Sequence, residues 1–323
     1  MKRFLWQICV FLLFPLGVVI GLYMYIDPFR VTRPFTMEYV NEKPLYKLNR
    51  EYFNFNIFNK QYTEYQYNSF IIGSSRTTAF NTYHWKDYLE TDAQPFIFTS
   101  WRENIEGMRQ KLVYFDSNNI DVRNVLLLFD CGEMYSFNLK QGDAPLTNHY
   151  WKLNGESRIK YQLDYFSAFI SQPTRIPSFI KDYRNKLKDM QVDTITCDNI
   201  GNDTIRLCPE HDYLAAKDNF PPQPDESELE AYIDDDMYSA LMQIKDVFAK
   251  HNTSYKVIVL PNYFHWKLNI ADLQALQSIF GDNNVYDLSG NHPLNGDKYS
   301  YNDEEHFDAN IGWQIIDYVY SQH

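Results

Sequence analysis

The chain has 323 residues, with 42 acidic and 30 basic side chains and a formal net charge of −12. No acidic residue precedes Asp27, so without Lys2 and Arg3 the remainder has 42 acidic against 28 basic side chains, a formal charge of −14. This surplus of negative charge repels polyanions and argues against nucleic acid as a partner.

The first predicted element is an apolar segment, Phe4–Ile26, that contains no charged residue. At ~1.5 Å per residue it is long enough to cross a hydrocarbon core of ~30 Å. Lys2 and Arg3 precede it, and such cations tend to stay in the cytoplasm. We therefore expect residues 1–27 to form a cytoplasmic stub and a single-pass cell-membrane anchor, with the rest extracytoplasmic. A cleaved signal peptide is the alternative, but no small-x-small site follows the apolar run.

After a connecting segment at residues 28–67, strands and helices alternate. The predicted strands are apolar runs rich in β-formers: Phe70–Ile72, Phe96–Phe98, Val125–Phe129, Tyr255–Leu260 and Val285–Leu288. Apolar residues recur at helical spacing in four segments, which begin at Ile105, Met237, Leu273 and Ile311, and each of these patterns predicts a helix. This alternation predicts a three-layer α/β/α sandwich around a mostly parallel five-stranded sheet at residues 68–323. An insertion interrupts it at about residues 135–236.

Cysteine positions point to one disulfide and one buried thiol. Cys197 and Cys208 flank a turn-rich stretch in the insertion, and hairpin geometry can bring their Cα atoms within bridging distance. In an oxidising compartment we expect them to form a disulfide. Cys131 ends an apolar strand and is interpreted as a buried thiol. No second Cys or His pair has zinc-ligand spacing, so no metal site is predicted.

Two short motifs carry the candidate chemistry. Gly73-Ser74-Ser75-Arg76 follows the first strand, and Asp303-Glu304-Glu305-His306 precedes the last helix. Both fall at the carboxyl ends of strands, where open α/β sheets collect their ligands. Together they supply a hydroxyl nucleophile, an imidazole base and a carboxylate, which serine acyl-transfer chemistry requires. Taken singly, Ser75 is equally well explained as a turn or cap serine, and His306 is better explained as a surface-loop histidine.

The motifs and the order of elements resemble the SGNH, or GDSL-like, hydrolase superfamily, especially its membrane-anchored branch with proteins of alginate O-acetylation and lipoteichoic-acid D-alanylation. The resemblance implies a flavodoxin-like strand order 2-1-3-4-5. It also implies Ser75 as nucleophile, His306 as base and Asp303 as the acid that orients the imidazole.

Other residues at this edge have predicted supporting roles. The chain offers Thr99-Ser100-Trp101 where the family has a glycine donor, so the expected oxyanion donors are the backbone N–H groups of Ser75 and of Ser100 or Trp101. Arg76 is expected to pair with Asp130 or Glu133 in a supporting role. Substrate-binding candidates follow the fourth strand, at Asn262, Tyr263 and Trp266.

The sequence therefore predicts a membrane-anchored acylesterase or O-acyltransferase that acts on a cell-surface or exported glycan and uses no cofactor. The alternative is a non-catalytic polysaccharide-binding or scaffold subunit. In either case a polytopic membrane O-acyltransferase is an expected partner.

Overall fold

The computed structural model describes residues 2–33, 49–131, 149–171, 177, 180–181 and 220–321. These residues belong to two units, one comprising Met1–Asn49 with Gln141–Thr194 and the other Arg50–Lys140 with Ile195–His323. Cys197 and Cys208, for which the sequence predicts a disulfide, lie outside the described residues, as does Glu133. Cys131 is a buried free thiol, as expected, and burial raises its pKa to about 12.

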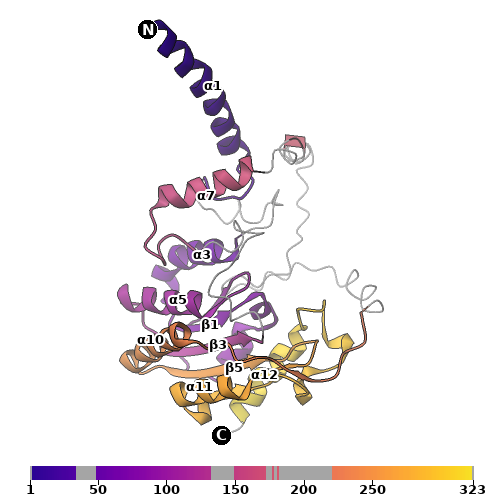
Figure 1. The fold of residues 1–323 in the computed structure, drawn as a ribbon. Helices are drawn as coiled ribbons and strands as arrows, with labels where there is room; N and C mark the ends of the chain where they lie inside the picture. Colours follow the sequence, from indigo (N-terminus) through magenta and orange to yellow (C-terminus); the bar gives the residue numbers. More distant parts are fainter. Residues whose placement is uncertain are drawn as a thin grey trace. The chain divides into compact units, whose positions relative to one another are not determined.

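Five parallel strands form the central sheet of the second unit, in the order β2-β1-β3-β5-β7 (Figure 1). They are β1 (Ser69–Gly73), β2 (Pro95–Thr99), β3 (Asn124–Asp130), β5 (Ser254–Leu260) and β7 (Val285–Asp287). Every residue of β1, β2 and β3 is buried, which explains their continuous apolar sequences. The predicted α/β fold with a five-stranded parallel sheet is confirmed. A separate parallel pair joins β4 (Ser227–Glu228) to β6 (Trp266–Lys267).

Aromatic side chains cover one face of the sheet. Phe58 of α3 (Arg50–Tyr65) lies 5.4 Å from Phe96 and 5.2 Å from Phe98 between ring centroids. Phe115 of α5 (Ile105–Ser117) stacks on Phe70 at 4.5 Å. Helix α3 lies within residues 28–67, which the sequence analysis assigns to a connecting segment, so this part of the chain contributes directly to the core.

The core on the opposite face mixes aliphatic side chains with aromatic ones such as Phe80 and Tyr301. Alternate strand residues, including Ile71, Ile97 and Leu126, pack with Ile311 and Ile315 of α12 (Ala309–Ser321). In Figure 1, α3 and α5 lie on one side of β1, β3 and β5, and α12 lies on the other. The short helix α4 (Thr82–Lys86) adds the fully buried Trp85 to this core.

The second unit also contains α10 (Asp235–His251) and α11 (Ile270–Phe280). Asp234 caps α10, since its carboxylate accepts a hydrogen bond of 2.9 Å from the N–H of Met237. Asp235 and Asp236 follow in the first turn, where negative charge favours the helix dipole. The three consecutive acidic residues Asp234, Asp235 and Asp236 are therefore explained by the start of this helix.

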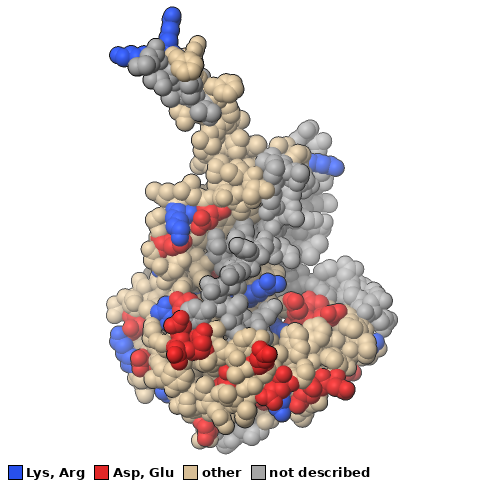
Figure 2. Space-filling model, in the orientation of Figure 1, with Lys and Arg blue, Asp and Glu red and all other residues tan. Residues whose placement is uncertain are grey.

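The first unit contains α1 (Lys2–Ile26) and α7 (Arg158–Ile170). In Figure 2, Lys and Arg gather at the N-terminal end of α1 and the described residues along the rest of it are uncharged. Asp27 ends the helix by turning the chain, because its carboxylate accepts from the N–H groups of Val31 and Thr32 at 3.1 and 3.2 Å. Among the residues that the structure describes, no helix combines the length and apolar character needed to cross a membrane.

Replacement of Gly312 tests how closely α12 approaches the rest of the second unit. A Cβ at this position would lie 2.2 Å from the carbonyl oxygen of Ala79, a backbone atom that cannot rotate away. Alanine is favoured over glycine in a helix by about 1 kcal/mol, but overpacking costs about 1–3 kcal/mol and more where backbone must shift. We expect Gly312→Ala to lower the free energy of unfolding, measured by denaturant titration. Asn310→Ala, an exposed change in the same helix, should stay within about 0.5 kcal/mol, and equal effects of the two changes would contradict the prediction.

Candidate active site

The turn after β1 presents Ser75. Ser74 caps the 3-10 turn η1 (Ser75–Ala79), with its hydroxyl accepting from the N–H of Arg76 at 3.2 Å. Gly73 is required for close packing, because a Cβ there would lie 2.9 Å from Cβ of Leu128 and 3.0 Å from its carbonyl oxygen. The turn is therefore pressed against β3, and Ser75, unlike the buried Ser74, remains partly exposed.

A tight loop before α12 presents Asp303 and His306. Its base is closed by an antiparallel bridge between Tyr301 and Phe307. Within it, the Asp303 carboxylate accepts hydrogen bonds of 2.8 Å from the N–H groups of both Glu305 and His306. An aspartate that accepts from backbone N–H groups two and three residues ahead folds the chain back on itself, so the Asp-x-x-His spacing brings the carboxylate beside its own imidazole.

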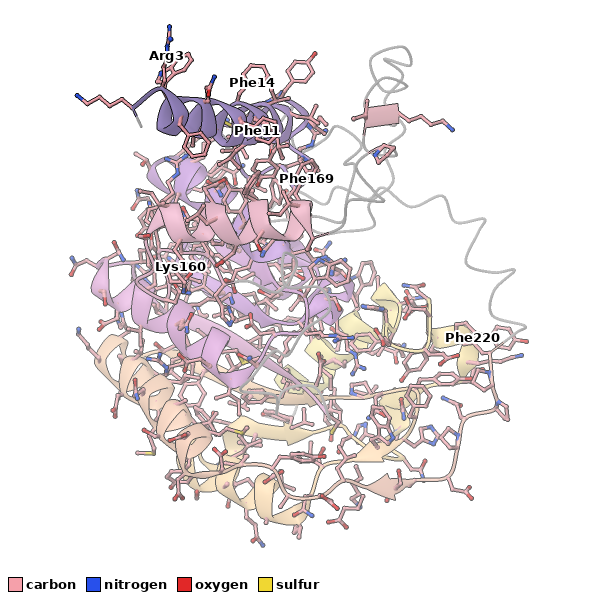
Figure 3. All side chains as sticks on the ribbon, turned by 45° about the horizontal axis from the view of Figure 1, so that its top comes forward. Arg3, Phe11, Phe14, Lys160, Phe169 and Phe220 are labelled. Carbon is pink, nitrogen blue, oxygen red and sulfur yellow. The ribbon has the colours of Figure 1, made fainter. Side chains whose placement is uncertain are left out.

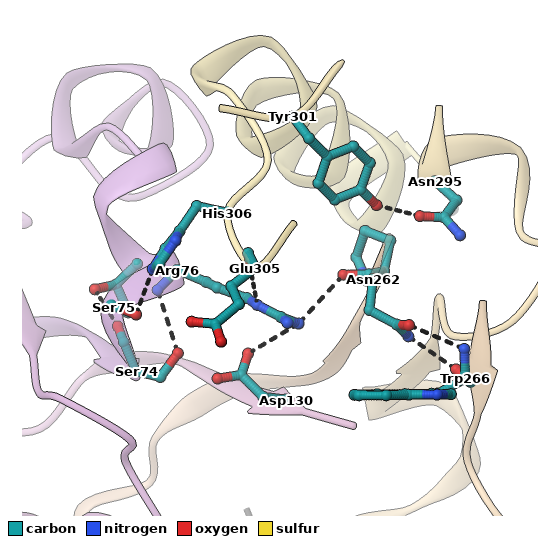
Figure 4. A network of polar contacts seen from close by, with 12 residues as sticks. Ser74, Ser75, Arg76, Asp130, Asn262, Trp266, Asn295, Tyr301, Glu305 and His306 are labelled. Atoms are coloured by element: carbon teal, nitrogen blue, oxygen red, sulfur yellow. Dashed lines mark hydrogen bonds and ion pairs between the residues drawn. The ribbon is translucent and has the colours of Figure 1, made fainter. Parts of the chain in front are cut away.

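The structure brings the three predicted catalytic residues together. Ser75 Oγ lies 2.7 Å from His306 Nε2 (Figure 4), and His306 Nδ1 lies 2.7 and 2.9 Å from the two oxygens of Asp303. Because an ionised carboxylate only accepts, Nδ1–H donates to Asp303 and leaves Nε2 to accept from the Ser75 hydroxyl. This is the arrangement in which an imidazole can take a proton from a serine.

The electrostatic environment keeps Asp303 ionised. Burial acts to raise the pKa of Asp303, but the hydrogen bond and charge of His306, with the two backbone N–H donors, outweigh it and lower the pKa below its ordinary value. The side chain nevertheless keeps 54% of its surface exposed, against 22% for His306. Water therefore screens part of this interaction.

Arg76 joins the two loops of the site. Its Nε donates to the carbonyl of Glu305 at 2.7 Å, and its Nη1 lies 3.5 Å from both the carbonyl of Pro261 and Oδ1 of Asp130 (Figure 4). The expected pairing with Asp130 is confirmed, and both side chains are buried. The contact with Glu305, next to His306, has no signal in the sequence, because it uses a backbone carbonyl.

The three predicted oxyanion donors compare differently with the structure. The N–H of Ser100 donates to the carbonyl of Gly73 at 3.2 Å, continuing the pairing of β1 with β2, so the prediction that it faces an oxyanion is wrong. The N–H of Ser75 meets no acceptor among the described residues and keeps its predicted role. Trp101 also stays a prediction, and the guanidinium of Arg50 covers its ring at 4.0 Å.

Two of the three predicted substrate-binding residues have structural roles instead. The buried amide of Asn262 donates to the carbonyl of Trp266 at 2.8 Å and accepts from its N–H at 2.9 Å, closing the turn after β5. Tyr263 is fully buried and its hydroxyl donates to the carbonyl of Pro221. Neither side chain is available to a substrate, so these two predictions are wrong. The Trp266 ring is partly exposed and stacks on Phe264 at 4.9 Å, which leaves its predicted role open.

A buried ionic cluster lies beneath the segment that follows β2. Lys111 of α5 is fully buried and contacts Glu103 at 2.6 Å and also Glu51 of α3. Burial alone lowers the pKa of Lys111, but the charges of Glu103 and Glu51 outweigh it and raise the pKa. Ser100 Oγ donates to the same Glu51 carboxylate at 3.4 Å. This cluster ties α3, α5 and residues 100–103 together, and composition gives no sign of it.

Within the part of the chain that the structure describes, no group of His, Cys, Asp and Glu residues could hold a metal ion. The sequence matches no protein-family model, and no curated protein is significantly similar to it. The site is therefore interpreted from its geometry.

The lowered pKa of Asp303 predicts a pH-dependent contribution to stability. A carboxyl whose pKa is lower in the folded state stabilises that state above its unfolded pKa and loses the effect as pH falls through the folded pKa. The difference in unfolding free energy between the native sequence and Asp303→Asn should be constant near neutral pH and shift toward Asp303→Asn in acid. Denaturant titrations over this range measure it, and a constant difference throughout would refute the lowered pKa.

The buried pair of Arg76 and Asp130 predicts strong coupling between the two side chains. Arg76→Gln leaves the Asp130 charge buried, and breaking such a pair costs about 3–5 kcal/mol. The double variant Arg76→Gln/Asp130→Asn removes the stranded charge and should recover part of that loss. Unfolding titrations of a double-mutant cycle measure the coupling, and strictly additive effects would show that the pair is not coupled.

Proposed function

We propose that this chain is a membrane-anchored, serine-dependent acylesterase or O-acyltransferase that acts on a cell-surface or exported glycan. The observation that carries the proposal is the continuous hydrogen-bonded series from Ser75 Oγ through His306 to Asp303. A turn serine or a surface histidine has no need of this alignment across 231 residues of sequence.

In the proposed reaction, Ser75 Oγ attacks the carbonyl carbon of an acyl donor while its proton passes to Nε2 of His306. The carbonyl electron pair moves onto oxygen, and in this proposal the N–H of Ser75 donates to that oxyanion. When the tetrahedral intermediate collapses, the donor's alkoxide leaves with the proton from His306. Water or a sugar hydroxyl then attacks the Ser75 ester and gives up its proton to His306. As the acid or new ester is released, His306 returns that proton to Ser75 Oγ and the site is regenerated. Asp303 holds the imidazole tautomer throughout.

The fold is consistent with the proposed relationship to SGNH, or GDSL-like, hydrolases. The order β2-β1-β3-β5-β7 corresponds to the flavodoxin-like 2-1-3-4-5, with helices against both faces. Ser75 follows β1, and Asp303 and His306 immediately precede α12. These are the positions that the family resemblance implies for the nucleophile and for the acid and base.

The proposed location rests on the N-terminal sequence. Phe4–Ile26 has no charged residue, and Lys2 and Arg3 precede it, which supports a cytoplasmic N-terminus and an extracytoplasmic catalytic unit. A polytopic membrane O-acyltransferase is the proposed partner, because an acyl group delivered across the membrane would reach Ser75 on the outer side.

A non-catalytic scaffold subunit is the second candidate. Its specific support is the Ser100 N–H, which is engaged by Gly73 and leaves Ser75 as one oxyanion donor with Trp101 untested. Loss of one such donor costs about 3 kcal/mol of transition-state stabilisation. A scaffold would have kept the fold and the triad while losing much of the rate.

The decisive experiment is labelling of the purified full-length chain with a serine-reactive fluorophosphonate. Ser75→Ala should abolish the label, and His306→Ala should slow it about 10²–10⁴-fold because the general base is lost. Asp303→Asn should be milder, since the base is present but less well oriented. Ser74→Ala is the matched control: it removes a capping hydroxyl worth about 1 kcal/mol of stability and should leave labelling intact. Labelling that survives Ser75→Ala, or none at all, would favour the scaffold.

A further inference from the structure

Helix α7 has a second apolar face that is exposed in the part of the first unit that the structure describes. Its first face, Tyr161, Tyr165 and Phe169, is buried. Ile159, Leu163 and Ile170 are instead 74%, 58% and 46% exposed. Packing among the described residues of the first unit therefore explains one face of α7 and not the other.

The exposed residues form a continuous stripe. At 100° per residue, positions 159, 163 and 170 fall within about 40° of each other around the helix axis. Ser167, Lys160 and Asp164 fall at about 80–140° from Ile159 around the axis, between the stripe and the buried Tyr161, and all three are exposed. In Figure 3, Lys160 and Phe169 lie on different sides of α7. The helix thus has a buried face, an apolar exposed face and a polar exposed face.

The stripe continues onto α1. Phe166 lies at its edge and contacts Tyr23 of α1, with ring centroids 5.4 Å apart, and Phe169 contacts the same ring at 5.3 Å. Beyond this contact α1 exposes further apolar side chains: Phe11, Leu13, Phe14, Leu16, Val18, Ile20 and Met24. The apolar surfaces of the two helices therefore belong to one surface of the first unit.

The point of contact defines where α7 would lie in a bilayer. From Phe4 to Tyr23, α1 extends for about 30 Å at 1.5 Å per residue, close to the thickness of a hydrocarbon core. Helix α7 meets α1 at the far end of that length, where the acyl chains give way to headgroups. A helix with one apolar and one charged face is stable in this region, lying in its plane.

We propose that α7 is an interfacial helix that inserts Ile159, Leu163 and Ile170 into the outer leaflet of a phospholipid bilayer. The proposal rests on the membrane anchorage proposed above, and not on the serine chemistry. A second attachment beside α1 would restrict rotation of the first unit about the anchor.

Engineered tryptophans in the full-length chain, reconstituted in phosphatidylcholine–phosphatidylglycerol nanodiscs, test the proposal. Leu163→Trp places the reporter in the stripe, and Asp164→Trp places it on the polar face one residue away. Both positions are exposed, so neither change disturbs the core. The quantity compared is the tryptophan fluorescence of each variant minus that of the native sequence under the same conditions. The signal of the Leu163→Trp variant should be lost with lipids brominated on their acyl chains and resist aqueous acrylamide, whereas the signal of the Asp164→Trp variant should behave in the opposite way.

The outcomes separate the possible failures. Equal acrylamide quenching at both positions, without quenching by brominated lipid, overturns the proposal. Protection of position 163 in native membranes but not in lipid-only nanodiscs also overturns it, in favour of a protein partner. If the chain does not remain with the nanodisc, the proposed membrane anchor is wrong, and the proposal that rests on it is overturned as well. Fluorophosphonate labelling of the same samples reports separately on the serine chemistry.

Discussion

One buried guanidinium connects the parts of the chain that form the candidate site. Arg76 follows the end of β1, and its partners are Asp130 at the end of β3, the carbonyl of Pro261 after β5 and the carbonyl of Glu305 beside His306. Only arginine offers several donors diverging in one plane. Asp130 balances a positive charge that would otherwise be costly to bury. The approach of the two loops that carry Ser75 and His306 therefore depends on a residue outside the candidate triad.

Close backbone packing adds a second constraint. Gly73 brings the turn that carries Ser75 against Leu128, and Gly312 brings α12 against Ala79 at the end of that turn. At both positions a methyl group would meet backbone atoms. The 3-10 turn that carries Ser75 is thus held between β3 and α12, two elements of a well-packed core, and the serine has little freedom to move away from His306.

Sequence reasoning succeeded where the chemistry lies in local patterns. The strand runs, the Asp-x-x-His loop and the serine after β1 are each defined within a few residues. It failed where a candidate polar group is already used by the backbone: the N–H of Ser100 donates to Gly73, and the side chain of Asn262 closes a turn with Trp266. Helix α3 was missed because nearly all residues of its first half are buried, so it has no one-sided apolar period. The Lys111 cluster joins three separate segments, and no local pattern reports it.

The exposure of Asp303 bears on the kind of substrate that suits the site. More than half of this side chain is exposed, so water screens its attraction for the imidazolium that forms during proton transfer. A small acyl donor would leave that screening in place. A polymer lying across the loop of Asp303 and His306 would exclude water and strengthen the interaction as the charge develops. On the proposed chemistry, the exposed acid is therefore better suited to an extended glycan acceptor than to a small soluble ester, because the substrate itself would supply the missing burial.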